Sequence, residues 1–217
     1  MSRTRRVALS LPLAILLPLG GCTSAYYGMM EQIGVEKRHI LRDRVEAGQE
    51  AQEEAQQQFE TTYEAFKTVT RYDGGDLEDF YDKMEDDFED CESRARDVRD
   101  RIDSIEQVSG DLFSEWASEI DQISNAKLRR QSQETLRDSQ QRYDRMIRAM
   151  QRAAAKMDPV ITAFRDQVLF LKHNLNARAV ASLETNVAEI QGEVDALIDD
   201  MQSAIVEAQR FLETMPS

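Results

Sequence analysis

Apolar residues recur along most of the chain in alternating steps of three and four positions. The longest run starts at Leu77 and reaches Ile123, and only Ser109 and Glu119 interrupt its apolar character. Steps of three and four place all members on one face of an α-helix, and a 3.5-residue repeat sustained over five or more heptads is typical of coiled-coil packing. The pattern therefore predicts long helices that pack through apolar seams.

The same repeat appears in three other segments. A weaker run extends from Leu41 to Val69, and stronger ones occupy residues 136–175 and 180–211. Turn-forming and capping residues separate the runs, since glycine and asparagine favour helix ends. These breaks are Asp73-Gly74-Gly75-Asp76, Ser124-Asn125 and His173-Asn174-Leu175-Asn176.

We therefore expect four helices, near residues 28–71, 77–123, 126–173 and 177–214. Asp158-Pro159 lies inside the third, but the heptad phase continues across it, so a kinked and continuous helix is expected. The middle two helices should each measure roughly 70 Å. Similar lengths and short turns favour an all-α fold, an elongated antiparallel coiled-coil-like four-helix bundle with up-down-up-down topology.

The distribution of charge supports this order and excludes one class of partner. The second and fourth predicted helices are acidic and the third is basic, so the third suits a position between the other two. The 217-residue chain has a formal net charge of −14. Because nucleic-acid binders need a positive face against phosphate, we expect no nucleic-acid partner.

The first 21 residues differ from the rest and read as a signal peptide. Arginines at positions 3, 5 and 6 precede an apolar stretch, Val7–Leu19, which contains two prolines and is too short to span a bilayer as a mature helix. Residues 22–27 would then form a tether, and residues 28–217 a single helical bundle. Ordinary secretory export is favoured, with twin-arginine export left open because Thr4-Arg5-Arg6 is a partial match.

The end of this segment, Leu19-Gly20-Gly21-Cys22, resembles the lipobox of bacterial lipoproteins. The resemblance implies cleavage before Cys22 and acylation of that residue with diacylglycerol and a further chain such as palmitate. Thr23 at the following position implies sorting to the periplasmic face of the outer membrane, with inner-membrane retention as the alternative. The membrane contact would then be the lipid anchor.

Three stretches of the remaining chain resemble a known family. They are Tyr26–Leu41 (YYGMMEQIGVEKRHIL), Asp73–Glu78 (DGGDLE) and Phe164–Arg178 (FRDQVLFLKHNLNAR). Together they are similar to a Gram-negative bacterial lipoprotein family of unknown function. The resemblance covers essentially the whole mature chain, implies a helical periplasmic lipoprotein, and transfers no catalytic residue.

The sequence offers few residues for metal or thiol chemistry. Glu36 and His39 have the spacing of a di-iron ligand pair, but the other histidine, His173, has Phe170 three positions before it, so no second pair exists and no metal or cofactor is expected. Cys91 occupies a seam position and should be a small buried side chain, with an intermolecular disulfide as the alternative. The carboxylate-rich stretch 76–92 should be a solvated helix start, with weak divalent-cation binding left open.

Motifs of common enzymes are missing from the sequence. It contains no GxxxxGK loop, GxSxG elbow or HExxH pair. We therefore expect no catalytic residue, no small-molecule substrate and no enzymatic activity.

One short stretch points to an interaction surface. Leu169 and Phe170 lie off the seam formed by Val168 and Leu171, on a flank that should face solvent, although a wide seam could also bury them. An apolar pair rimmed by polar and basic groups is typical of docking sites, here Lys172, His173 and Arg178. The sequence thus predicts a non-enzymatic envelope scaffold or adaptor with a protein partner or self-association. The alternative is a helical module that binds a lipid or a peptidoglycan fragment.

Overall fold

The computed structural model describes residues 37–69, 77–174 and 177–215, without the side chains of residues 69, 177–185 and 189. The chain divides into two units, residues 1–36 and 37–217, and only the second is described. The predicted signal peptide, the tether and the first nine residues of the first predicted helix lie outside the described residues. The described helices are α2 (Lys37–Val69), α3 (Leu77–Asp121), α4 (Ala126–His173) and α5 (Ala177–Thr214).

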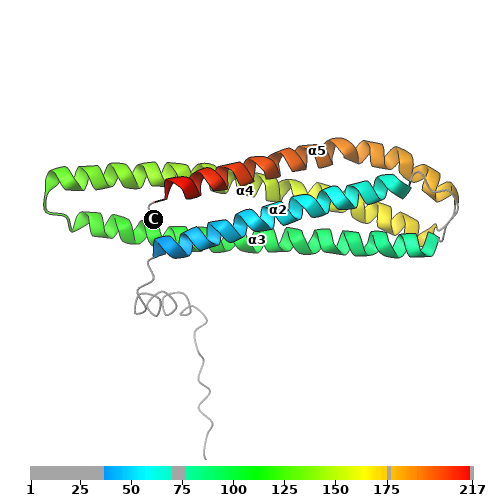
Figure 1. Ribbon diagram of the computed structural model, residues 1–217, viewed down its shortest axis with the longest axis horizontal. Helices are drawn as coiled ribbons and strands as arrows, with labels where there is room; N and C mark the ends of the chain where they lie inside the picture. Colours follow the sequence, from blue (N-terminus) through cyan, green and yellow to red (C-terminus); the bar gives the residue numbers. More distant parts are fainter. Residues whose placement is uncertain (1–36, 70–76, 175–176, 216–217) are drawn as a thin grey trace, which may run out of the picture. The chain divides into compact units, whose positions relative to one another are not determined.

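The four helices form one antiparallel bundle (Figure 1). Around the bundle axis, α3 packs on α2 and α4, α4 packs on α5, and α2 closes the ring by packing on α5. Consecutive helices run in opposite directions, and no strand occurs in the described part of the chain. The predicted all-α four-helix bundle with up-down-up-down topology is confirmed.

The heptad seams form the core over most of the bundle's length. Along α3, every predicted seam residue from Tyr81 to Ser109 is buried. The corresponding residues of α5 from Val187 to Phe211 are buried as well. The 3.5-residue pattern therefore identified the inward faces correctly wherever four helices surround the axis.

Three aromatic rings lie together in the core near the ends of α2 and α4. Phe164 of α4 stacks on Phe66 with ring centroids 4.9 Å apart, and Phe59 lies 6.3 Å from the Phe164 ring. All three side chains are fully buried. Because rings of this size bury large apolar areas and gain further from stacking, this cluster is a main source of stability.

The basic helix α4 pairs with both acidic neighbours. Its Arg165 lies 2.5 Å from Glu92 of α3, and its Lys156 lies 2.7 Å from Asp200 of α5. Such exposed pairs contribute little to stability individually, but they favour the observed order of helices over others. The helix continues through Pro159 without a break, as the unbroken heptad phase predicted.

The turn between α3 and α4 corrects one predicted boundary. α3 ends at Asp121, two residues before the predicted end at Ile123. The Asn125 side chain accepts hydrogen bonds from the backbone N–H groups of Lys127 and Leu128 and caps α4. The guanidinium of Arg129 donates to the Ile123 carbonyl, so a side chain supplies the hydrogen bond that a backbone N–H would donate to this carbonyl inside a helix.

At one end of the bundle, the helix ends are staggered along the bundle axis. Lys37, the first residue of α2, forms an ion pair of 2.8 Å with Glu115, so the last residues of α3 extend beyond α2. Figure 1 shows the α3–α4 hairpin projecting past the start of α2 and the end of α5. We call this projection, residues 116–121, the turn and residues 126–135, the overhang. We call the position along the bundle where the four-helix section ends and the overhang begins the step.

A buried polar side chain without a hydrogen-bond partner interrupts the apolar seam of α2. Gln52 is fully buried, and neither its amide nitrogen nor its amide oxygen has a hydrogen-bond partner. Gln167 of α4 is also buried, but it accepts a hydrogen bond of 3.0 Å from Asn186. A buried amide without partners costs free energy, whereas a paired one does not.

Replacing Gln52 by methionine is expected to raise the free energy of unfolding by about 1–3 kcal/mol, because a side chain of similar shape removes the desolvation cost. Chemical denaturation of the two proteins measures the difference. The matched control, Gln167→Met, should give no gain because it leaves Asn186 without its acceptor. A loss of stability in Gln52→Met would contradict the buried, unpaired position of this amide.

Candidate functional site

The predicted surface pair lies at the end of α4, away from the step. Leu169 is 47% exposed and Phe170 37% exposed, while their neighbours Val168 and Leu171 are buried. Together with Leu128, they are the only large hydrophobic side chains of the described residues that are classed as exposed. The alternative that a wide seam buries Leu169 and Phe170 is therefore wrong. We call these two residues the end patch.

Close to the end patch along α4, Lys172 joins a network of charged and polar groups. Lys172 donates a 3.2 Å hydrogen bond to Glu85 of α3, and the Tyr81 hydroxyl donates to the same carboxylate at 2.5 Å. The hydrogen bonds from Tyr81 and then Lys172 hold the pKa of Glu85 below its ordinary value, and those to Tyr81 and Glu85 raise the pKa of Lys172. Both groups therefore stay charged at neutral pH, which fixes a polar rim beside the apolar pair.

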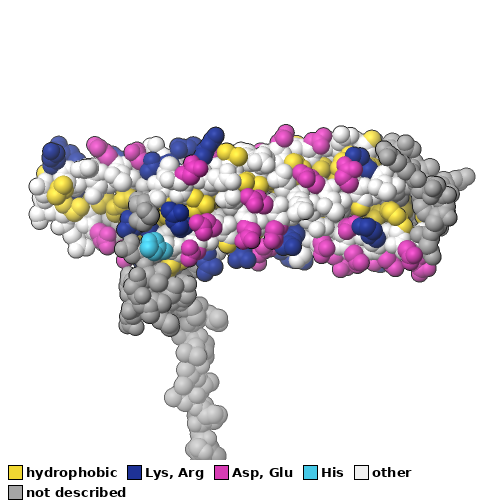
Figure 2. Space-filling model, viewed as in Figure 1, with side chains coloured by type: hydrophobic (Ala, Val, Ile, Leu, Met, Phe, Trp, Pro, Cys, Tyr) yellow, Lys and Arg dark blue, Asp and Glu magenta, His cyan; other side chains and the backbone are white. Residues whose placement is uncertain are grey.

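Of the two other predicted members of this surface, His173 has a described side chain and Arg178 does not. His173 is the last residue of α4 and is exposed, so it lies at the same end as the pair. Arg178 lies in the first turn of α5, but its side chain is outside the described residues. Figure 2 shows hydrophobic side chains at the surface towards this end and acidic side chains along the lower edge formed by α3.

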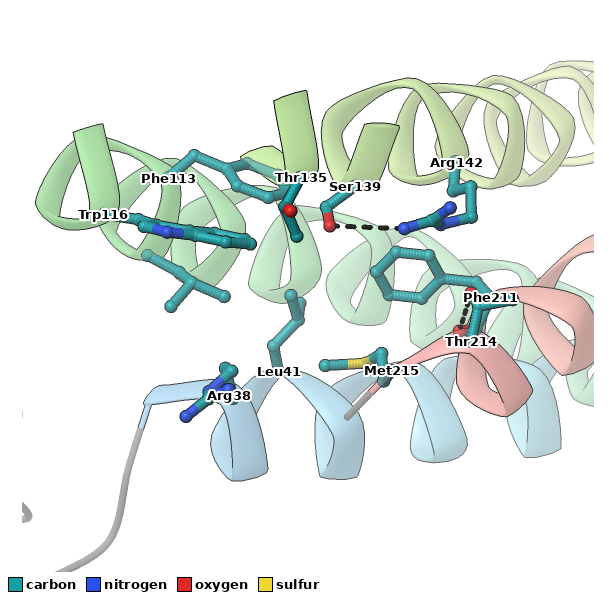
Figure 3. Close-up of a pocket in the computed structure, with 11 residues that line it drawn as sticks. Arg38, Leu41, Phe113, Trp116, Thr135, Ser139, Arg142, Phe211, Thr214 and Met215 are labelled. Carbon is teal, nitrogen blue, oxygen red and sulfur yellow. Dashed lines mark hydrogen bonds between the residues drawn. The ribbon is translucent and has the colours of Figure 1, made fainter. Parts of the chain in front are cut away.

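A second apolar surface, which the sequence did not predict, lies at the step. Side chains from all four helices converge there on a notch of about 170 Å³ (Figure 3). Its apolar wall is formed by Leu41, Leu112, Phe113, Trp116, Phe211 and Met215. The Phe113 and Tyr143 rings meet edge to face with centroids 5.5 Å apart, and Tyr143 contacts Phe211 in the same way at 6.2 Å.

The rim of the notch carries two arginines and small polar groups. Arg38, in the first turn of α2, lies on one side, and on the other Arg142 of α4 donates to the Ser139 hydroxyl at 3.4 Å. Seam residues of α3 change from buried to half-buried at Leu112 and Trp116, where α2 ends its coverage. Within the described residues, α3 and α4 are longer than α2 and α5, so part of the α3–α4 hairpin extends beyond the four-helix section.

Cys91 is a core residue with no exposed surface. Its thiol donates to the Thr62 hydroxyl at 3.1 Å, and that hydroxyl donates to the Asp87 carbonyl at the same distance. Burial raises the pKa of the thiol from its ordinary value of 9.0 to about 12. A buried thiol that stays protonated at neutral pH is neither a nucleophile nor accessible to a second chain, which argues against the intermolecular disulfide.

The remaining candidates do not form a site. His39, in the first turn of α2, and His173, at the end of α4, are both exposed and lie at opposite ends of the bundle, and Glu36 is outside the described residues. Within the described ranges, no cluster of His, Cys, Asp or Glu could hold a metal ion, and this includes the acidic start of α3. None of the described helices has the length and apolar character needed to cross a membrane.

Comparison with known proteins assigns the chain to a family. A family model described as "Protein of unknown function (DUF2959)" matches residues 26–215, nearly the whole chain beyond the predicted anchor. The chain belongs to the DUF2959 family. No curated protein and no solved structure matches it. Membership of DUF2959 agrees with the expected family of unknown function and brings no activity or site residue with it.

Proposed function

We propose that this DUF2959 protein is a lipid-anchored scaffold of the bacterial envelope. In this proposal Cys22, which lies outside the described residues, carries the lipid on the periplasmic face of the outer membrane, and the helical bundle docks a protein partner without catalysing a reaction. The observation that carries it is the end patch, because two adjacent large apolar side chains are exposed on α4 while the seam residues beside them, Val168 and Leu171, are buried.

The surroundings of the end patch indicate the chemistry of the partner. An apolar pair beside the charged group of Lys172 and the exposed His173 suits a partner surface with an apolar centre and acidic residues around it. The carboxylate of Glu85 holds Lys172 in place at 3.2 Å, so the cationic side of the rim is preorganised.

A second candidate function rests on the notch. Its aromatic wall and arginine rim could hold the apolar end of a lipid or a peptidoglycan fragment with an anionic group. However, its volume of about 170 Å³ is smaller than the ~300–1,000 Å³ of typical ligand pockets. The scaffold therefore remains the favoured function.

The double variant Leu169→Glu/Phe170→Glu tests the scaffold proposal. Both side chains are exposed, so we expect unchanged helicity and a melting temperature within a few degrees, but loss of the cross-linked partner in cells. Thr162→Glu, an exposed change on the same helix, should retain the partner. Unfolding of the double variant, or an unchanged set of cross-linked proteins, would refute the docking role of the end patch.

A further inference from the structure

We propose that a second copy of the chain covers the overhang and completes the bundle there. The two overhangs would lie side by side and antiparallel, forming a central four-helix section shared by both copies. This inference is independent of the end patch, which lies at the other end of the bundle.

The first support is an uncovered face that continues from the notch to the tip of the hairpin. On α4, Thr135 and Arg142 line the notch, and Leu128 lies one heptad before Thr135 on the same face. Leu128 is 53% exposed. On α3, the seam residues Leu112 and Trp116 are only half-buried. Within the described part of the chain, the face that α2 and α5 cover along the bundle is therefore uncovered in the overhang.

The second support is the charge at the four helix ends near the step. The positive N-terminal end of a helix dipole favours acidic residues and the negative C-terminal end favours basic ones. Here the described first turns of α2 and α4 contain no acidic residue, and the last turns of α3 and α5 contain no basic residue. Instead, basic residues begin two helices and acidic residues end the other two. They are Lys37 and Arg38 in α2, Lys127 and Arg129 in α4, Glu119 and Asp121 in α3, and Glu213 in α5.

Twofold symmetry brings these ends together with opposite charges. An axis that places a second overhang antiparallel on the first sets α3 beside α3 and α4 beside α4. Within one copy, α2 lies beside α3, and α5 lies beside α4. In the dimer, α3 of the second copy therefore lies end to end with α2 of the first, and α4 of the second copy lies end to end with α5 of the first. Each C-terminal end then meets an N-terminal end, so the helix dipoles align head to tail.

In this arrangement the charges that oppose their own helix dipoles lie close to charges of opposite sign from the other copy. Glu119 and Asp121 of the second copy approach the start of α2, where Lys37 and Arg38 lie. Lys127 of the second copy approaches the end of α5, where Glu213 lies. Both α2 helices also begin on the same side of such a dimer, as two membrane anchors preceding them would require.

The exposed leucine of one copy then reaches the notch of the other. The tip of the second overhang is level with the step, so Leu128 of the second copy lies opposite Arg142 and Ser139. A cavity of roughly 150 Å³ can hold a benzene molecule, so a notch of about 170 Å³ has room for one leucine side chain. The overhang spans only roughly two to three turns of each helix, so the dimer should be weak and aided by confinement to a membrane.

A symmetric cysteine tests the geometry in cells that produce the full chain. Thr135 lies midway along α4 between Leu128 and Arg142, which this arrangement places opposite each other, so two copies of residue 135 should lie close to the twofold axis. Thr135→Cys in a Cys91→Ala background should therefore yield a disulfide-linked dimer under oxidising conditions. Thr162→Cys, exposed on the same helix away from the overhang, should not. The background without an added cysteine controls for Cys22. Absence of the Thr135 dimer, or equal linkage at position 162, would overturn the proposal.

Leu128→Glu tests the contact with the notch. It should abolish the Thr135 cross-link and raise the dissociation constant of the detergent-extracted chain by at least about tenfold, because a carboxylate would enter an apolar site. Leu169→Glu, a matched change of an exposed leucine in the end patch, should leave the cross-link unchanged. Both changes are on the surface, so circular dichroism should be unaffected. If Leu169→Glu breaks the dimer and Leu128→Glu does not, the second copy binds at the end patch and this inference is wrong.

Discussion

Replacing Phe164 by alanine is expected to lower the free energy of unfolding by about 3–5 kcal/mol. The ring has no exposed surface and stacks on Phe66 at 4.9 Å, with Phe59 at 6.3 Å. Its removal forfeits the burial of an aromatic side chain and leaves a cavity between two helices, and two stacking contacts are lost as well. Denaturant unfolding followed by circular dichroism measures the change.

Phe170→Ala provides a matched control for this prediction. The same residue type on the same helix, six positions later, is 37% exposed, so its loss should cost less than about 1 kcal/mol. If the two variants lost equal stability, the orientation of α4 in the bundle would be wrong.

Cys22→Ala is expected to abolish membrane attachment. Under the proposed anchor the acyl chains are the attachment, since each buried methylene contributes about 0.8 kcal/mol and no described helix could cross a bilayer. We expect loss of labelled palmitate and release of the chain from the outer-membrane fraction, or accumulation of an unprocessed form. Metabolic labelling and fractionation measure this result.

The only other cysteine supplies the control for the anchor. Cys91→Ala should keep both the label and the membrane fraction, because Cys91 is buried in the bundle. Incorporation of palmitate by Cys22→Ala, with unchanged fractionation, would refute the lipoprotein assignment.

The heptad pattern was sufficient to predict the fold because it reports which side of each helix is buried. In α3 every predicted seam residue from Tyr81 to Ser109 is buried, where four helices enclose the axis. Ser109 is polar but buried, since its hydroxyl donates to the Glu106 carbonyl within its own helix. The phase of the repeat also predicted correctly that Pro159 would not end α4.

The stagger of the helices could not be obtained in the same way. Sliding one helix by a heptad places seam residues opposite seam residues again, so the repeat does not fix the register. The consequence is visible at Leu112 and Trp116, which the pattern placed in the core and the step leaves half-exposed. The notch, which depends on that stagger, was therefore missed.

The end patch was predictable because it violates the pattern. Leu169 and Phe170 lie between the seam residues Val168 and Leu171. Two apolar residues outside a seam are either buried in a broad core or exposed at the surface. The sequence left both readings open, and packing against α3 and α5 decided for the surface. The hydrogen bonds that position Lys172 through Glu85 join residues far apart in the sequence and required the structure.

Site-specific photo-cross-linking from position 170 in living cells tests the scaffold claim most directly. A photoreactive phenylalanine analogue in place of Phe170 should form one prominent adduct with a different protein, while the same analogue at the exposed Thr162 should form none. Adduct formation should be lost when Leu169→Glu is added. An adduct with a second copy of the chain or with lipid alone, or no adduct above that from position 162, would contradict the account.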